Sequence, residues 1–338
     1  GLSTGQVQAL TAGQLANLTT AQVASLSNDQ VVALTTAQAS KFSGDQMAAM
    51  TTAQIAAIET ADVQQLTAAQ LQGITTAGVK ALTTDQVAAL TTAQISKLLD
   101  TQVKEMSTAQ IAAIETADIA KMTNDQVAAI TTAGIVALST AQVQALTASQ
   151  LANLTTAQVA AIETADIAAL TTAQISKLTM DQMPALTTAQ VAAIETADLV
   201  LLTNSQIESI STAGIAALST DQVKVITTSQ IKALTAAQIT ALTTDVAVVN
   251  TDQLRLLNDE QVAAITTAGI AALTTDQVSN LKATQVAAMT TAQIGAIEAA
   301  DTLVLTQAQI NSMSQEQWNA ISSTNRTAMV TAGKVAPY

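Results

Sequence analysis

Carboxylate pairs are the residues of this chain best placed to do chemistry. The pentapeptide IETAD occurs four times and IEAAD once, so each copy places an Asp three residues after a Glu. Carboxylate oxygens are the ligands that Ca²⁺ prefers. Weak calcium binding along one edge of the molecule is therefore one interpretation, with candidate ligands Glu59, Asp62, Glu115, Asp118, Glu163 and Asp166.

The same carboxylates also have a purely structural interpretation. A Glu and an Asp at this spacing can occupy the N-cap and N3 positions of a short helix. The positive end of the helix dipole repels cations there, which disfavours a metal site. The sequence therefore predicts no cofactor, with calcium kept as an open alternative.

Composition excludes most other chemistry. The chain contains no His and no Cys, which removes the usual ligands of zinc and haem, thiol nucleophiles and the commonest general base. The net charge of −13 disfavours nucleic acid and anionic membranes as partners. No apolar run is long enough to span a bilayer, so membrane insertion is not expected. No unique cluster interrupts the sequence to form a pocket, and we do not expect an enzyme.

An eight-residue repeat organises the whole chain. Octads run without interruption from Leu2 to Ala241, a seven-residue unit covers residues 242–248, and octads resume from Val249 to Ala336. The consensus is Leu/Ile/Met, Thr/Ser, Thr, Ala/Asp, Gln, Val/Ile, Ala and Ala at positions 1 to 8. The missing residue near Val248 predicts a local kink.

One short helix per octad satisfies this pattern better than the alternatives. In a continuous helix, eight residues turn through about 800°, so the apolar stripe would spiral away from any core. In a strand, positions 1 and 6 would point to opposite faces. If a new helix begins in every octad, position 2 is a Thr or Ser N-cap and position 5 is the Gln of a capping box. It also makes positions 1 and 6 the partners of a hydrophobic staple.

Short helices of this kind are unstable alone and must pack on their neighbours. The expected fold is therefore all-α, an α-solenoid of about 42 two-turn helices with positions 1 and 6 inward. Whether two or three octads make one turn stays open. We expect a repeat solenoid over residues 1–312 and degenerate repeats over 313–338 that form a cap or docking element.

The two ends predict self-assembly. The chain opens directly on a consensus octad, whereas Trp318 replaces the usual Val near the other end. An open solenoid end exposes core, and contacts that do not close on themselves give filaments. The expected partner is a second copy of the chain in a head-to-tail homopolymer, with contacts through Leu2, Val7, Trp318 and Tyr338.

The word LTTAQVAA resembles the octapeptide arrays of large, acidic, cysteine-free surface or secreted proteins of Gram-negative bacteria, which are described as adhesin-like. The resemblance covers nearly the whole chain and implies an extracellular or cell-surface structural role without catalytic residues. The first hypothesis is therefore a filament subunit or the stalk of a surface adhesin.

Two other functions stay open. An ice-binding protein would present regular threonine arrays on a stiff, weakly charged scaffold. However, the position-3 threonines are interrupted at Asn28, Gly44, Asn124, Met180 and Asn204. A passive spacer that holds another domain away from a cell is the third interpretation.

Overall fold

The computed structural model describes residues 2–337, which form 39 α-helices and two 3-10 helices and contain no strand. The chain divides into two compact units, residues 1–177 and 178–338, and each is described by itself. The boundary between Lys177 and Leu178 coincides with the end of an octad. The prediction of an α-solenoid built from one short helix per octad is confirmed.

The helices of the first unit are α1 (Thr4–Gln8), α2 (Ala12–Ala16), α3 (Thr20–Ala24), α4 (Asn28–Val32), α5 (Thr36–Ala39), α6 (Gly44–Ala49), α7 (Thr52–Ala57), α8 (Thr60–Val63), α9 (Ala68–Gly73), α10 (Thr76–Ala81), α11 (Thr84–Ala88), α12 (Thr92–Ile95), α13 (Asp100–Glu105), α14 (Thr108–Ala112), α15 (Thr116–Ile119), α16 (Asn124–Ala129), α17 (Thr132–Val136), α18 (Thr140–Ala145), α19 (Ala148–Ala152), α20 (Thr156–Ala161), α21 (Thr164–Ala168) and α22 (Thr172–Ile175).

The helices of the second unit are η1 (Met183–Ala185), α23 (Thr188–Ala193), α24 (Thr196–Leu199), α25 (Asn204–Ser209), α26 (Thr212–Ala216), α27 (Thr220–Val225), α28 (Thr228–Ala233), α29 (Ala236–Ala241), η2 (Thr243–Val248), α30 (Thr251–Leu254), α31 (Asp259–Ala263), α32 (Thr267–Ala271), α33 (Thr275–Asn280), α34 (Ala283–Ala288), α35 (Thr291–Ala296), α36 (Ala299–Val304), α37 (Gln307–Asn311), α38 (Gln315–Ala320) and α39 (Ser323–Thr331).

Most helices begin with the predicted capping box. In α7, the Thr51 backbone N–H donates to Gln54 Oε1 at 2.7 Å, and the Gln54 backbone N–H donates to Thr51 Oγ1 at 3.2 Å. These two bonds satisfy backbone donors that the first turn of a helix leaves without partners. The same arrangement recurs in most octads, so most position-2 threonines are committed to capping. Exceptions include α8, whose N-cap is Glu59, and α10, whose N3 residue is Gly78.

Two extended residues turn the chain between successive helices. After α7, Ile58 has φ −64° and ψ 127°, and Glu59 has φ −65° and ψ 147°. A helix cannot continue through two extended residues, so the chain leaves in a new direction and the next helix starts at position 3. The predicted short corners are therefore positions 1 and 2 of the octad.

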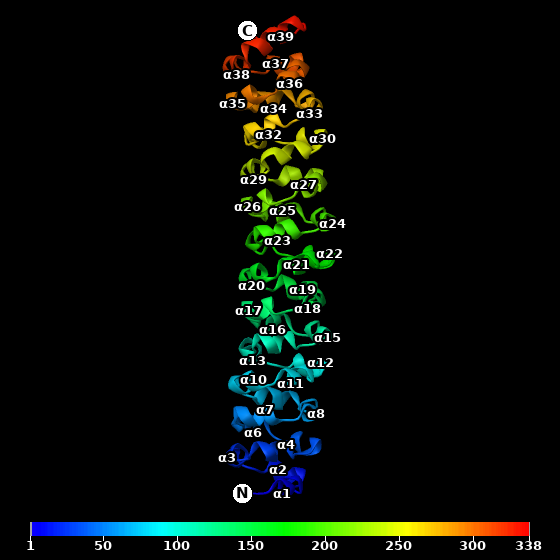
Figure 1. Cartoon of the computed structure of the whole chain (residues 1–338), viewed down its shortest axis with the longest axis vertical. Helices are drawn as coiled ribbons and strands as arrows, with labels where there is room; N and C mark the ends of the chain where they lie inside the picture. Colours follow the sequence, from blue (N-terminus) through cyan, green and yellow to red (C-terminus); the bar gives the residue numbers. More distant parts are fainter. Residues whose placement is uncertain (1, 338) are drawn as a thin grey trace. The chain divides into compact units, whose positions relative to one another are not determined.

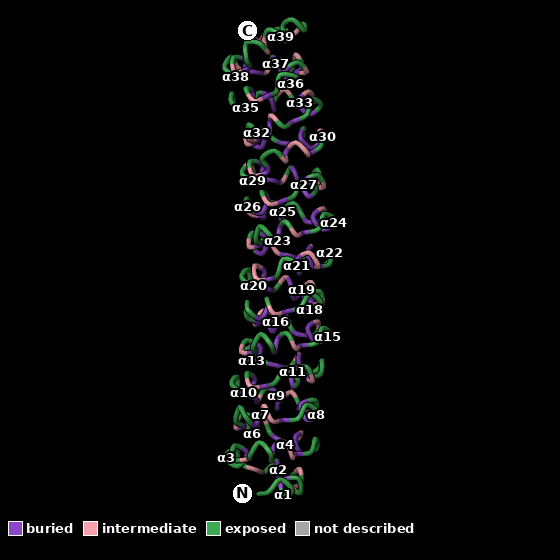
Figure 2. The backbone as a smooth tube through the Cα atoms, in the orientation of Figure 1, coloured by how far each residue is buried: buried purple, intermediate pink, exposed green. Residues whose placement is uncertain are grey.

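Positions 1 and 6 form the core, as predicted. In α7 and the corner that follows, Ile55 and Ile58 are 1% and 7% exposed. Figure 2 shows buried segments recurring with each helix, alternating with exposed segments. Complete burial of one such side chain contributes about 1.5–3 kcal/mol, so packing supplies the stability that a two-turn helix lacks.

Helices three octads apart pack on one another. In the first unit α7 contacts α10, and α10 contacts α13; in the second, α23 contacts α26, and α26 contacts α29 (Figure 1). One layer of each solenoid therefore contains about three octads. This contact pattern decides the alternative that the sequence left open, in favour of three octads rather than two.

The seven-residue unit, residues 242–248, forms the single 3-10 helix η2. Leu242, Val246 and Val249 stay buried, while Thr243 adopts φ +50°, the only positive φ at a described non-glycine residue. The residue missing from this unit is the position-5 Gln, and the helix tightens to the 3-10 form. A Cβ on Gly269, three octads later, would lie 2.6 Å from the carbonyl oxygen of Thr243. Position 269 therefore requires glycine, because the 3-10 backbone at Thr243 lies too close for a side chain.

No helix within residues 2–337 is long and apolar enough to cross a membrane.

Candidate functional site

The glutamine at position 5 links octads that are distant in the sequence. In α11, Gln86 Oε1 accepts from the Thr83 backbone N–H at 2.8 Å. Its Nε2 donates to the carbonyl oxygens of Ile55 at 2.9 Å and Ile58 at 2.7 Å, at the end of the helix four octads earlier. We call this two-sided contact a glutamine bracket. Gln86 is 2% exposed, so the bracket lies in the core.

Brackets repeat through both units, with acceptors 28 and 31 residues earlier; across the seven-residue unit these distances shorten by one, as for Gln261 with Leu234 and Ile231. In the second unit, Gln230 Nε2 donates to Leu199 O at 2.9 Å and to Leu202 O at 2.8 Å. Carbonyls at the end of a helix have no partner within the helix, and burying them unbonded is costly. The Gln amide supplies a donor from another layer to both carbonyls, of which the first, Leu199 O, also accepts from the Leu202 N–H at 3.3 Å. Other residues that make the bracket include Gln46, Gln54, Gln102, Gln110, Gln126, Gln150, Gln238, Gln285, Gln293, Gln309 and Gln317.

Sequence reasoning assigned this glutamine to capping alone and missed its second role. One signal was available. Glu is as good as Gln in a capping box, and its charge suits the helix N-terminus. Yet no position 5 in the chain is a Glu. A Glu carboxylate would accept the capping hydrogen bond but could not donate to the distant carbonyls.

Leu99 offers a stabilising substitution, because it occupies the N-cap position of α13 and provides no side-chain acceptor. The Gln102 half of the capping box is present, with the Leu99 N–H donating to Gln102 Oε1 at 2.9 Å. Leu99→Thr is expected to raise the free energy of unfolding by about 0.5–2 kcal/mol, because it supplies the missing acceptor. Urea denaturation measures the change. Leu256→Thr, at an equally exposed leucine outside any cap, should give no gain.

The predicted calcium ligands do not converge. In the first IETAD copy, Asp62 is at the buried position 5, whereas Glu59 is an exposed N-cap residue whose side chain makes no capping hydrogen bond. Glu115 with Asp118, and Glu163 with Asp166, repeat this separation of an exposed Glu from a buried Asp. Within residues 2–337, no three carboxylates are grouped so that they could hold a metal ion.

Two of the buried aspartates instead bond to threonines of another layer. In the IEAAD copy, Thr275 Oγ1 donates to Asp301 Oδ1 at 2.7 Å. In the first IETAD copy, Thr36 makes the corresponding hydrogen bond to Asp62. Burial raises the pKa of Asp62 above 3.8; the Thr36 hydrogen bond opposes this shift, and the Glu59 charge adds to it. Asp62 therefore takes the place of a bracket residue without being able to donate when ionised.

Asp62→Gln is expected to stabilise the protein at neutral pH by roughly 0.5–1.5 kcal/mol, because Gln can form the bracket. A raised pKa means that the stabilising contribution of Asp62 is complete below pH 3.8 and is lost as the pH rises through the raised value. The advantage of the variant should therefore be larger at pH 7 than at pH 3. Urea denaturation at both values tests this, with the exposed Asp45→Asn as control. An equal gain at both values would contradict the titration argument.

In the first three octads the position-5 glutamine makes only the capping half of the bracket. Gln6, Gln14 and Gln22 are exposed, and their Nε2 groups donate to no carbonyl of residues 2–337. The first complete bracket is that of Gln38, whose Nε2 donates to Val7 O at 3.0 Å and to other carbonyls nearby. The bracket spans four octads, so the first three have no earlier helix end within residues 2–337.

Apolar side chains accompany these free amides. Leu2 is 46% exposed, and Leu10, Leu18 and Leu26 are half-buried, although position 1 is buried in almost all later octads. A hollow of about 440 Å³ lies among these residues and is lined by Leu2, Leu18, Gln22, Ser25, Leu26, Ser27 and Gln30. We define the N-terminal face as Leu2, Gln6, Leu10, Gln14, Leu18, Gln22 and Leu26.

The C-terminal end is built differently. Gln317 of α38 still makes an ordinary bracket, with Nε2 donating to Met289 O at 2.6 Å. Position 5 then holds Asn325 and Gly333 in the last two octads. The helix α39 runs through the octad boundary instead of turning, with Met329 fully buried. The departure from the repeat thus begins at residue 321.

The end of α39 reverses the chain. The N–H of Lys334 donates to Met329 O at 3.0 Å, the N–H of Gly333 donates to Val330 O at 3.0 Å, and Gly333 has φ +87°. This is the Schellman arrangement, which requires a left-handed residue and suits glycine. We call residues 332–337, which follow the helix, the C-terminal strap.

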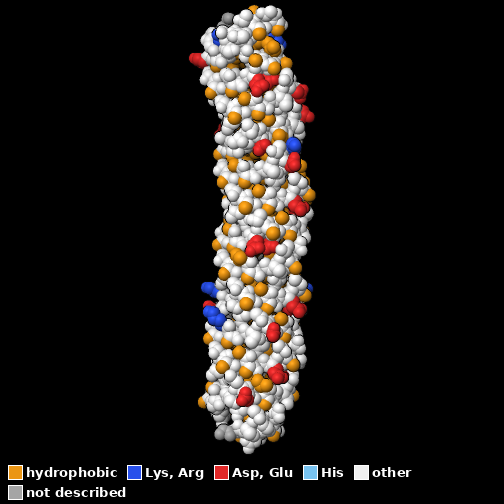
Figure 3. All heavy atoms as spheres, viewed as in Figure 1, with side chains coloured by type: hydrophobic (Ala, Val, Ile, Leu, Met, Phe, Trp, Pro, Cys, Tyr) orange, Lys and Arg blue, Asp and Glu red, His pale blue; other side chains and the backbone are white. Residues whose placement is uncertain are grey.

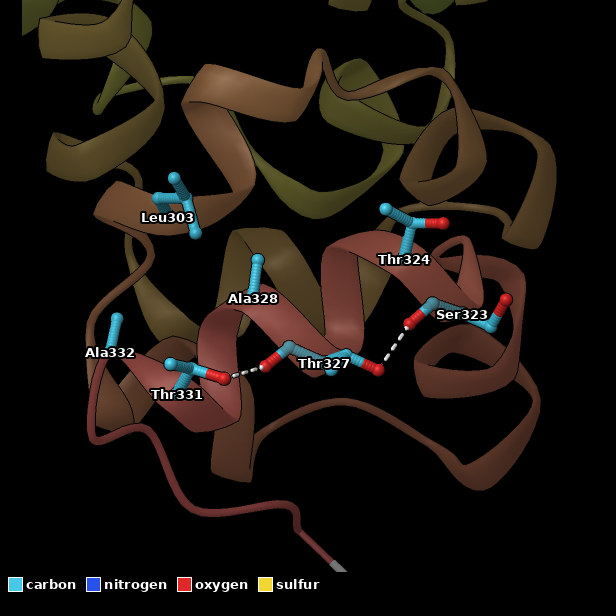
Figure 4. A pocket seen from close by; sticks show the side chains of 7 residues that line it. All are labelled: Leu303, Ser323, Thr324, Thr327, Ala328, Thr331 and Ala332. Atoms are coloured by element: carbon cyan, nitrogen blue, oxygen red, sulfur yellow. Dashed lines mark hydrogen bonds between the residues drawn. The ribbon is translucent and has the colours of Figure 1, made fainter.

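Two side chains hold this end in place. Gln307 of α37 donates from Nε2 to Val335 O at 2.8 Å and accepts from the Val335 N–H at 3.0 Å. Arg326 donates from Nη1 to the carbonyl oxygen of Trp318 at 3.2 Å. An open hollow of about 680 Å³ is lined by Leu303 and by residues of α39 and Ala332, with Thr327 and Thr331 hydrogen-bonded along the helix (Figure 4).

The four predicted assembly residues have different environments. Leu2 is exposed on the N-terminal face, Val7 is fully buried beneath it, and Trp318 is buried at 7% exposure. Tyr338 lies outside the described residues. The structure therefore places Val7 and Trp318 in the core rather than on a surface, and the assembly role of the four residues stays a prediction.

Charged side chains are scattered over the surface of the described residues. Figure 3 shows isolated acidic and basic side chains separated by neutral surface on the face in view. Among the described residues, ion pairs join Lys80 to Glu105 at 3.2 Å and Lys224 to Asp221 at 3.3 Å, and all four side chains are exposed. Such pairs contribute little to stability.

Comparison with known proteins identifies the repeat. A family profile described as the ALTTAQ repeat matches residues 1–36, 13–43, 55–92, 119–156, 159–193 and 191–228. These stretches together cover more than half of the chain. No curated protein matches the sequence.

Proposed function

The chain belongs to the ALTTAQ repeat family, and on this basis we propose that it is a non-enzymatic, extracellular structural protein that joins end to end with copies of itself. In this role it is the subunit of a filament or the stalk of a bacterial surface adhesin. Its partner is a second copy of the chain, attached head to tail, and the N-terminal face is the joining surface.

The free Gln amides of the N-terminal face carry this proposal. Within each unit, the same amide at the same octad position bonds to helix-end carbonyls, such as those of Ile55 and Ile58. Gln6, Gln14 and Gln22 present three such donors beside half-buried leucines. We infer that the complementary surface on a second copy is a set of helix-end carbonyls at octad spacing.

The rest of the molecule supports a structural role. The side chains most able to do chemistry, the buried Asp residues of the IETAD copies, bond to threonines within the fold or replace bracket residues. The low content of charged residues, 11%, gives a largely neutral surface that suits a load-bearing or spacing function. The structure adds no observation that favours ice binding, because position-2 hydroxyls accept capping hydrogen bonds and some position-3 threonines bond to aspartates, as in Thr251 to Asp276.

Electron microscopy of the purified chain across a concentration series tests the proposal. Fibres with a regular axial repeat, appearing as concentration rises, are the expected result. A triple variant, Gln6→Met with Gln14→Met and Gln22→Met, should raise the concentration at which fibres form, because it removes the three free donors. Gln8→Met, an exposed residue near the same face, is the matched control. Particles of one fixed size at every concentration would overturn the proposal.

A further inference from the structure

We propose that the surface of the second unit carries a binding site for a carboxylated sugar, built by Asp252, Arg255, Leu256 and Lys282. These four residues line a hollow of about 300 Å³ where the end of α30 meets the start of α34. The inference goes beyond the proposed function, because it concerns the surface of the repeat and does not depend on joining between copies.

A glutamine bracket holds together the two elements that supply these side chains. Gln285 of α34 donates from Nε2 to Leu254 O and to Leu257 O, both at 3.0 Å. Arg255 lies between these two acceptors in the sequence, and Lys282 is the N-cap residue of the helix that carries Gln285. The backbones that carry the two cations are therefore joined by buried hydrogen bonds, and only the side chains must adjust to a ligand.

Lys282 is an unusual N-cap residue. It is the only basic residue at position 2, where nearly all octads carry Thr, Ser, Asn or Glu. Helix α34 consequently begins without a side-chain cap hydrogen bond. The lysine also brings a positive charge to the positive end of the helix dipole. Both effects lower the stability of the helix, and residues that depart from a local rule in this way are typical of functional positions.

The two cations are available to a ligand. Arg255 and Lys282 are exposed, and within residues 2–337 neither side chain makes an ion pair or a hydrogen bond to the protein. Asp252 precedes Arg255 by three residues, a spacing that permits an ion pair on a helix, but the two do not form one. An arginine guanidinium presents paired N–H donors that match the two oxygens of a carboxylate. Arg255 and Lys282 together therefore favour an anionic group in this hollow.

The other two lining residues narrow the class of ligand. Two cations and the exposed Asp252 leave one net positive charge, which suits a singly charged carboxylate. Ionised Asp252 accepts hydrogen bonds and repels anions, so the ligand must also present donors such as hydroxyl groups. Leu256 is 39% exposed and offers an apolar surface to the C–H face of a ring. A carboxylate, neighbouring hydroxyls and such a ring face occur together in a uronic acid, an acidic unit of polysaccharides.

Titration of ¹⁵N-leucine-labelled protein with sodium galacturonate tests the assignment, read by NMR at the backbone amide of Leu256. We expect a saturable shift, and binding about tenfold weaker in Arg255→Gln and in Lys282→Thr, the effect of losing one charged hydrogen bond. Lys282→Thr should also unfold at a higher urea concentration, because it restores the N-cap. Lys232→Gln, at an exposed lysine of α28 outside the hollow, is the matched control and should bind as the wild-type chain does.

Three results would overturn the inference. The first is a wild-type chain whose Leu256 amide shows no saturable shift with galacturonate. The second is unchanged affinity in both Arg255→Gln and Lys282→Thr, with the fold intact by circular dichroism, since the carboxylate would then bind elsewhere. The third is binding of acetate, phosphate or neutral galactose as tight as that of galacturonate, which would show no selectivity for a carboxylated sugar. End-to-end joining is tested separately by electron microscopy, so the proposed function stands or falls independently.

Discussion

Gln126→Met is expected to lower the free energy of unfolding around α16 by about 3 kcal/mol. Gln126 is 1% exposed; its Oε1 accepts from the Thr123 N–H at 2.8 Å, and its Nε2 donates to Ile95 O at 2.9 Å and Leu98 O at 2.7 Å. Methionine has nearly the same volume, so packing is preserved. The loss comes from the Thr123 N–H and the buried Leu98 carbonyl, which lose these partners, and from the buried Ile95 carbonyl, which keeps only the Leu98 N–H at 3.3 Å.

Gln14→Met is the matched control for this prediction. Gln14 has the same capping role, with the Thr11 N–H donating to its Oε1 at 2.8 Å, but its Nε2 faces solvent. Its replacement should cost only about 1 kcal/mol, the value of a capping interaction. Native-state hydrogen exchange reports the local free energy at both helices. Equal losses at the two positions would contradict the bracket and leave only the capping role.

A second variant separates the two halves of the bracket. Gln126→Glu keeps the oxygen that accepts from Thr123 but replaces the amide donor by a carboxylate facing two carbonyls. The expected loss at neutral pH is at least as large as that of Gln126→Met, because an ionised group is buried against like partial charges. Acidification should reduce the loss, since a protonated carboxyl can donate.

Gly73→Ala has the second largest expected effect. A Cβ on Gly73, at the end of α9, would lie 2.4 Å from the carbonyl oxygen of Gly44 and 2.7 Å from its Cα, both backbone atoms of α6. Neither atom can rotate away, so the two helices must separate. The expected cost is about 1–3 kcal/mol, typical of overpacking.

Gly13→Ala provides the control in another helix. A Cβ on Gly13 would meet nothing within 4 Å, and the residue lies within α2. Alanine should therefore stabilise the protein there by up to about 1 kcal/mol through helix propensity. Urea denaturation compares the two variants, which differ only in position. A stabilising Gly73→Ala would show that α6 and α9 do not approach as closely as the structure indicates.

The local architecture could be predicted from the octad because its causes lie within eight residues. The N-cap Thr51 and its Gln54 partner are three residues apart, and the corner at Ile58 follows from the restart of the helix. The inward positions 1 and 6 follow from their apolar character. These predictions hold throughout the described residues, with exceptions such as the 3-10 helices η1 and η2 where Pro184 or a missing Gln disturbs the pattern.

Two features could not be predicted from a single octad because they depend on residues about 30 positions apart. Three octads per layer follows from contacts such as α7 with α10, which no property of one octad specifies. The Gln amide finds its acceptors 28 and 31 residues earlier, as in Gln86 with Ile58 and Ile55. Likewise, the Glu–Asp spacing of IETAD suggested that Asp62 could be a metal ligand. Its environment is instead determined by burial and by the hydrogen bond with Thr36, 26 residues earlier.

Protection of glutamine side-chain amides tests the central claim most directly, because the same bracket is proposed to hold the array together and to join copies. Exchange of the Nε2 protons can be followed by NMR in ¹⁵N-glutamine-labelled protein, with signals assigned from single substitutions. We predict protection at Gln126 at every concentration, and at Gln6, Gln14 and Gln22 only after copies have joined. Fast exchange at Gln126, or no change at the three N-terminal glutamines in joined chains, would contradict the account.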